Sequence, residues 1–400
     1  MFVLLAIGLL LVLLCAGVSF ESIPVEEALR LQALHWNQIT TGRGMRMRVH
    51  SYGTGPVVRE VRPRSGEEGT TTFHLAYSQK EDLDGLVLSL RKEGGGNSQG
   101  PVTREEWISF VEGRVRHSGY TSVRAELLEE SPPTFLVSVR ADRPYELVGA
   151  HQMRILFGAL KFPLDDTSVA ESVVVIQMLL AGTFAGSIGV LVAVLVCASF
   201  VPNMLQKGTL DPLLARPLGR ARLLLFKYLG GLWFVTLLAA FITVGCGLAL
   251  GVGSGFYNSW FVACTGTVTA VFAVVYSVTV LFGVLTRSFG ASALLSIGVW
   301  WVSSIIVQLK QSLPMMLGDE VPAGVQKAFD VAYAVLPKTS DIGALNIVLL
   351  SRSQLSEEAY QRQFGAQMPS IDWAFSLGTT AAFVAVMLGL AVWVFGRRDY

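Results

Sequence analysis

Long apolar stretches alternate with polar stretches along this chain, and their lengths predict its organisation. A helix needs about 20 apolar residues to cross a bilayer. Six stretches approach or exceed that length and are almost free of charged residues: 1–20, 173–200, 228–252, 260–286, 292–309 and 373–395. The pattern predicts an α-helical polytopic membrane protein with six transmembrane helices.

The first apolar stretch, residues 1–20, could also be a secretory signal peptide. It has no basic residues at its start and no convincing small-x-small cleavage site. We therefore expect it to remain as the first transmembrane helix.

Residues 21–170 have a different character and carry most of the charged residues of the chain. Helical spacing of apolar residues is found at 24–38 and 104–115, and 93–101 is a glycine-rich loop. Short alternating stretches predict strands at 45–50, 57–61, 71–77, 86–90, 123–128 and 135–139. These elements predict an α+β domain inserted between the first and second transmembrane helices.

Composition supports a membrane protein and offers little catalytic chemistry. The chain has 400 residues, 52% hydrophobic and 15% charged, with a net charge of +1, so nothing suggests nucleic-acid binding. All five histidines lie within residues 21–170, in spacings that match no zinc signature. All four cysteines fall in predicted spans, so the inserted domain cannot depend on disulfides. We expect no catalytic residue, no metal site and no cofactor in this chain.

The loop at 201–227 is short and strongly basic. Short loops rich in Lys and Arg lie on the cytoplasmic side of a membrane. Its single acidic residue is Asp211, and its basic residues are Lys207, Arg216, Arg220, Arg222 and Lys227. Six spans with both termini in the cytoplasm also place Arg287 and Arg397 there, and they make the α+β domain extracytoplasmic.

The middle of this loop predicts a short helix. Thr209 can cap its N-terminus, and Asp211 complements the helix dipole there. Leu210, Leu213 and Leu214 then share one face, and Pro217 helps to end the helix. Such an apolar ridge either rests in the lipid headgroup layer or docks on a partner protein.

The loop sequence favours the docking alternative because it resembles a known family. Lys207-Gly208-Thr209-Leu210-Asp211, then Leu214-Ala215-Arg216-Pro217-Leu218-Gly219-Arg220, and finally Lys227 resemble the cytoplasmic loop of the type-2 ABC transporter permeases. In that family the loop helix docks in a groove of a separate ATP-binding subunit. The short helix at 326–336 and the basic chain end are also similar to the family.

The chain has no visible energy source of its own for transport. Apart from the cytoplasmic loop and Arg287, residues 172–309 contain no Asp, Glu, Lys, Arg or His, and the last span has none either. An ion-coupled transporter generally needs such groups in the membrane. The chain also lacks a Gly-x-x-x-x-Gly-Lys-Ser/Thr nucleotide-binding motif.

The resemblance thus implies that residues 171–400 form the permease domain of an ATP-driven exporter in the cell membrane, with an outer loop at 310–372. Its implied partners are a cytoplasmic ATP-binding subunit that holds ATP and Mg²⁺, a second permease subunit of the same or another kind, and the lipid bilayer. The implied ATPase-coupling residues are Lys207, Gly208, Thr209, Leu210, Asp211, Leu213, Leu214, Arg216, Pro217 and Arg220.

A second hypothesis comes from a different functional class. The chain could be a membrane-anchored sensor or assembly scaffold whose outer domain binds a ligand or partner. The size of the 21–170 domain is compatible with that function, whereas the loop sequence favours the permease.

Overall fold

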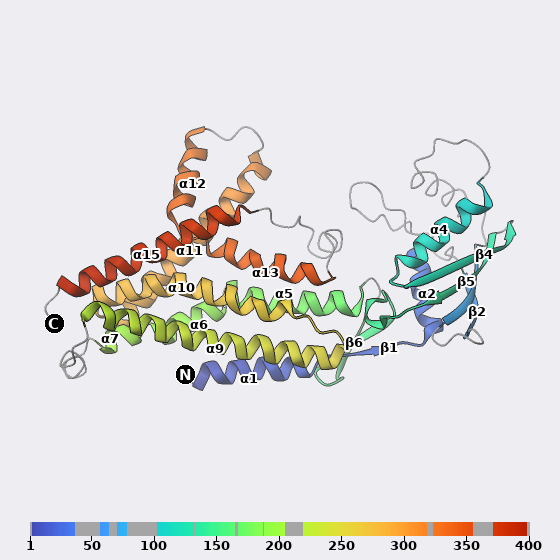
Figure 1. Cartoon of the computed structure of the whole chain (residues 1–400), viewed down its shortest axis with the longest axis horizontal. Helices are drawn as coiled ribbons and strands as arrows, with labels where there is room; N and C mark the ends of the chain where they lie inside the picture. The colour runs from blue at the N-terminus through green and yellow to red at the C-terminus, as the bar shows by residue number, and fades with distance from the viewer. Residues whose placement is uncertain are drawn as a thin grey trace.

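The structure, a computed structural model, consists of an elongated helical bundle with an α+β domain beyond one end of it (Figure 1). It describes residues 2–36, 57–63, 70–77, 102–130, 133–164, 167–186, 188–204, 219–317, 323–354 and 371–397. The predicted strands at 45–50 and 86–90 and the glycine-rich loop at 93–101 lie outside these ranges.

The described part of the α+β domain contains an antiparallel sheet of four strands and the helices α2 and α4, at positions predicted from the sequence. Strand β4 alternates between buried and exposed residues, so one face of the sheet packs in the core. Phe73, Val115, Phe135 and Val137 are fully buried there. The elements are α2 (Val25–Trp36), β2 (Val57–Pro63), β3 (Thr70–Ala76), α4 (Arg104–Arg116), β4 (Ser122–Glu130) and β5 (Pro133–Arg140), and the strand order is β2-β3-β5-β4.

Side-chain hydrogen bonds fix both helices of this domain. Thr103 and Glu106 form a capping box at the start of α4, which satisfies two backbone N–H groups. Gln32 of α2 donates to the carbonyl oxygen of Val148 at 2.7 Å and accepts from the Tyr120 hydroxyl at 2.9 Å. Burial raises the pKa of Tyr120 to about 12, although the hydrogen bond to Gln32 acts in the opposite direction.

A second antiparallel sheet joins the domain to the bundle and was not predicted. Its strands have only four or five residues, too few for a clear alternating pattern. The pairing also joins segments that are far apart in the sequence, since Ser22 pairs with His151. The strand order is β1-β6-β7, with β1 (Ser19–Ser22), β6 (His151–Ile155) and β7 (Leu160–Pro163); a short 3₁₀ helix, η1 (Pro144–Glu146), precedes β6.

Among the described residues, four helices are long and apolar enough to cross a membrane: α9 (Arg220–Ser254), α10 (Trp260–Thr286), the first part of α11 (Phe289–Leu317), and α15 (Trp373–Arg397). They coincide with four of the six predicted spans.

The other two predicted spans are shorter in the structure. Residues 1–20 contain α1 (Phe2–Ala16), which has 15 residues. Residues 173–200 contain two helices on either side of residue 187, α5 (Val169–Gly186) and α6 (Ile188–Cys197), followed by the short α7 (Phe200–Met204). At 1.5 Å per residue, none of these reaches the roughly 30 Å of a bilayer core. The number of six spans therefore remains a prediction.

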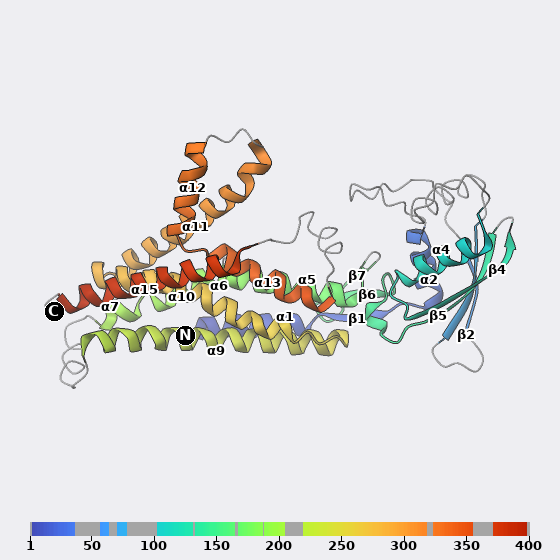
Figure 2. The same cartoon turned by 45° about the horizontal axis from the view of Figure 1, so that its top comes forward.

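In its described residues, the predicted outer loop at 310–372 contains the end of α11 and the helices α12 (Ala323–Val335) and α13 (Thr339–Gln354). Helix α12 confirms the helix predicted at 326–336, whereas α13 was not predicted. In both views α12 and the second half of α11 project away from the other helices, and α13 runs alongside the bundle (Figure 1 and Figure 2).

Helix α10 lies at the centre of the bundle and is the most buried of the four long helices. It packs against α9 through aromatic rings: Tyr276 stacks on Tyr228 and on Phe272, with ring centroids 5.4 and 5.1 Å apart. The Tyr228 hydroxyl donates to the carbonyl oxygen of Ala273 at 2.9 Å. Gly231 leaves room for this stack, because a Cβ there would lie 2.7 Å from the Tyr276 hydroxyl oxygen.

We expect a fragment of residues 19–164 to fold by itself and to be unaffected by reducing agents, because it has its own core and no cysteine. Within it, Phe135→Ala should lower the free energy of unfolding by about 3–5 kcal/mol. Leu128→Ala, at an exposed position on β4, should change it by less than about 0.5 kcal/mol. Urea denaturation followed by circular dichroism measures both. A fragment without a cooperative transition would contradict an independent domain.

We expect Gly231→Ala to destabilise the bundle, because the added methyl group displaces Tyr276 from its stack. Overpacking of this kind costs about 1–3 kcal/mol. Gly230→Ala is the matched control, since a Cβ at Gly230 meets no atom within 4 Å. Thermal unfolding in detergent should show a lower midpoint for Gly231→Ala only. Equal midpoints for the two variants would show that the stack tolerates the methyl group.

Candidate functional site

The predicted coupling loop lies between α7 and α9, and the structure describes its two ends. Residues 205–218 lie outside the described ranges. They include nine of the ten predicted site residues: Lys207, Gly208, Thr209, Leu210, Asp211, Leu213, Leu214, Arg216 and Pro217. The tenth, Arg220, is the first residue of α9. The residues on both sides of this gap show how the two ends of the loop pack on the bundle.

The incoming end of the loop is fixed by α7. Val201, Pro202 and Met204 are buried, although α7 has only five residues. They approach α10 closely at Gly283, where a Cβ would lie 3.3 Å from Cβ of Val201 and 3.5 Å from Cδ of Pro202. A larger residue than glycine would separate the two helices, so this contact depends on Gly283.

The outgoing end is fixed by the first two turns of α9. Gly219 has an extended backbone, and its carbonyl oxygen accepts from the N–H of Leu223 at 3.1 Å. Leu223, Leu224 and Tyr228 are buried on one face of the helix. Because Tyr228 belongs to the aromatic stack on α10, the outgoing end is packed on the same helix as the incoming end.

Both ends share one hydrophobic core with the last helix. Phe395 and Ala391 of α15 are fully buried in the cluster that also contains Val201, Leu224 and Tyr276. A well-packed core has few voids and transmits displacement rather than absorbing it. Any force on the loop therefore reaches α10 and α15 directly.

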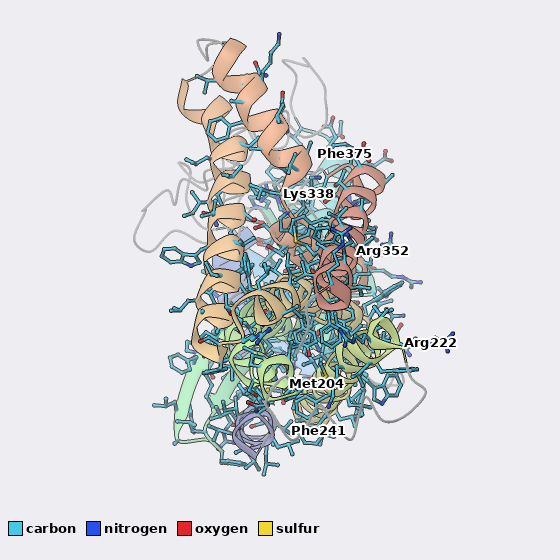
Figure 3. All side chains as sticks on the ribbon, turned by 90° about the vertical axis from the view of Figure 1, so that its left-hand side faces the viewer. Met204, Arg222, Phe241, Lys338, Arg352 and Phe375 are labelled. Carbon is cyan, nitrogen blue, oxygen red and sulfur yellow. The ribbon has the colours of Figure 1, made fainter. Side chains whose placement is uncertain are left out.

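Basic residues gather at this end of the bundle. Figure 1 shows α7 and the C-terminus at the end opposite the α+β domain, and Figure 3 views the bundle from that side, with Arg222 directed away from α9. The described segments 200–204, 219–230, 283–290 and 391–397 contain no Asp or Glu. Their basic residues are Arg220, Arg222, Lys227, Arg287 and Arg397. The positive-inside rule predicts a cytoplasmic location for such a basic face.

A buried polar cluster lies in the other half of the bundle and was missed in the sequence. Lys338 and Asp341 are both almost completely buried, although the sequence placed them in an outer loop. The N–H of Lys338 donates to the Thr380 hydroxyl, 17 residues before Arg397 in α15. At 1.5 Å per residue this is about 26 Å from Arg397 along the helix. The available signal was the polarity of 338–341 directly after Pro337, which permits a helix start there.

The cluster connects α12, α13 and α15. One carboxylate oxygen of Asp341 accepts from the hydroxyls of Tyr333 and Ser376, the latter at 2.8 Å. The Lys338 ammonium donates to the Thr379 hydroxyl and lies 4.6 Å from the Tyr333 ring centroid. The second oxygen of Asp341 is buried and has no hydrogen-bond partner among the described residues. Breaking such contacts in a low-dielectric site is costly, so the cluster holds these three helices together.

A metal site is not formed by the part of the chain that the structure describes. No group of three or more His, Cys, Asp or Glu side chains in the described ranges could hold a metal ion. Within these ranges, the arrangement offers a loop whose two ends are packed on the bundle, a basic face and a shared hydrophobic core.

Comparison with protein families identifies the membrane part. Residues 138–400 match the model of the ABC-2 family transporter proteins, and no curated protein matches the chain. The match covers more than half of the chain and includes the basic loop and all helices from α5 onward. The chain belongs to the ABC-2 transporter family.

Proposed function

We propose that this chain is the permease subunit of an ATP-driven exporter and that a separate cytoplasmic ATPase drives it through the 201–227 loop. Membership of the ABC-2 family already makes it an ABC transporter permease. The observation that best supports the coupling role is the common core under both ends of the loop. A loop that merely connected two helices would not require both its ends to be packed on α10.

In this proposal the loop helix presents Leu210, Leu213 and Leu214 to an apolar groove of the ATPase. Lys207, Asp211 and Arg216 set its orientation, because charges at the rim of a contact determine register and association rate more than residence time. ATP and Mg²⁺ belong to the partner subunit. Closure of the ATPase on ATP pushes the loop, and α7 and α9 transfer the displacement to α10.

Helix α15 extends this transfer toward the other side of the membrane. Its C-terminal end packs in the core below the loop through Phe395, and its N-terminal half holds the polar cluster through Ser376 and Thr379. A displacement at one end of α15 therefore acts on α12 and α13 at the other. A second permease subunit completes the transport path in this proposal.

The basic end of the bundle should face the cytoplasm and the α+β domain should lie outside. We expect a cysteine at Leu128 on β4 to react with a membrane-impermeant maleimide in intact cells, in a variant whose four native cysteines are replaced by alanine. A cysteine at Gly219 should react only after permeabilisation. Both positions are exposed, so access to the reagent is the only difference between them. Labelling of both positions in intact cells would rule out this topology.

The loop helix itself is tested by Leu213→Asp combined with Leu214→Asp. If both leucines are buried against the ATPase, two unpaired carboxylates cost several kcal/mol, and the ATPase should dissociate. The control is Val57→Asp combined with Leu128→Asp, at exposed apolar positions of the α+β domain. Copurification of the ATPase with each variant from membranes gives the result.

Normal membrane insertion of the loop variant, together with wild-type retention of the ATPase, would contradict the coupling role. The loop helix would then rest in the headgroup layer. That result would favour the alternative hypothesis of a membrane-anchored sensor or scaffold.

A further inference from the structure

The turn between β6 and β7 places large apolar side chains where a protein in water would avoid them. Leu156 and Phe157 are the first two of the four turn residues, 156–159, and the Phe157 side chain is 78% exposed. Their φ angles are 53° and 57°. Turn positions with positive φ normally hold Gly, Asn or Asp, because a bulky side chain is strained there. Something must compensate for both the strain and the exposure.

The exposed apolar surface continues along β7. Leu160 and Phe162 are each about half exposed, and Lys161 between them is also exposed. The turn and the strand together form an apolar tip with two basic residues beside it. Arg154 on β6 is the cross-strand partner of Lys161 and so shares its face of the hairpin. Arg154 pairs with Glu21 at 3.0 Å, which leaves Lys161 as the basic residue available to other groups.

The position of the turn indicates what covers this tip. The N–H of Phe157 donates to the carbonyl oxygen of Gly17 at 2.9 Å, directly after the end of α1. The Phe157 ring passes 3.3 Å from the point where a Cβ of Gly17 would lie. The outer face of α1 is entirely apolar and exposed at Leu9, Leu10, Leu13 and Leu14. In a membrane protein this face meets lipid, and Phe157 prolongs it.

The apolar surface of this face does not end with α1. Leu156, Phe157 and Phe162 add apolar surface beyond Ala16, and Lys161 is suited to the phosphate groups of the headgroup layer.

We propose that the β6–β7 hairpin inserts its turn into the lipid bilayer beside the end of α1 and so anchors the base of the α+β domain on the membrane surface. The occupant of this surface is lipid, with its acyl chains at Phe157 and its phosphate groups at Lys161. Aromatic and aliphatic residues flanked by a lysine are typical of such interfacial contacts. The inference concerns the domain base alone and does not depend on coupling to an ATPase.

The test is electron paramagnetic resonance of a spin label in the full chain, reconstituted in nanodiscs of phosphatidylethanolamine and phosphatidylglycerol. The four native cysteines are replaced by alanine, and single labels are placed by Phe157→Cys, Leu13→Cys or Leu128→Cys. Leu13 lies on the exposed face of α1, whereas Leu128 is equally exposed but lies on β4 of the α+β domain. Collision rates with oxygen, which enters lipid, and with a charged nickel chelate, which does not, report the surroundings of the label.

At position 157 we expect collisions with oxygen to exceed those with nickel several-fold, as at position 13 and unlike position 128. A label at 157 that behaves like the one at 128 would place the turn in water and overturn the proposal. A label shielded from both reagents would show protein cover and overturn it too.

A second measurement avoids both the cysteine replacements and the label. Brominated acyl chains should quench the fluorescence of the tryptophan introduced by Phe157→Trp. In Leu128→Trp, fluorescence should be quenched only to the extent that the native tryptophans are quenched in both variants. Equal quenching in the two variants would also contradict insertion.

Discussion

The stacking of Tyr228, Tyr276 and Phe272 is the contact on which the rest of the bundle depends. These rings fill the space between α9 and α10 at the level where the basic loop enters and leaves the membrane part. Within a bilayer, apolar burial does not drive helix association, so close packing and hydrogen bonds must do so. The stack provides both, because Gly231 admits Tyr276 closely and the Tyr228 hydroxyl bonds to the backbone of α10. The outgoing end of the loop is consequently packed on α10, the most buried of the four long helices.

The elements predicted correctly are those that depend on a local pattern of apolar and polar residues. The four long apolar helices were found from length and composition, and β3, β5, α2 and α4 from periodicity. The coupling role of the 201–227 loop stays a prediction, because nine of its ten predicted site residues lie outside the described ranges. In contrast, the β1-β6-β7 sheet was missed, because its pairing unites Ser19 with Arg154 across most of the inserted domain. A local pattern of four residues cannot encode a contact of that range.

The polar cluster was missed for another reason. Lys338 and Asp341 were interpreted as loop residues because charged side chains are mostly found in water. Their burial depends on partners from α12 and α15, namely the hydroxyls of Tyr333, Ser376 and Thr379, which no local pattern brings together.

The pairing of β1 with β6 also bears on how the α+β domain relates to the family. Ser22 and His151 are direct partners in the ladder, so residues 23–150 leave the bundle and return to it at neighbouring points. The family match begins at residue 138, within β5, so the first helix and most of this domain precede it. Because the two ends of this segment lie on paired strands, a change in its length or sequence need not alter the separation of α1 and α5.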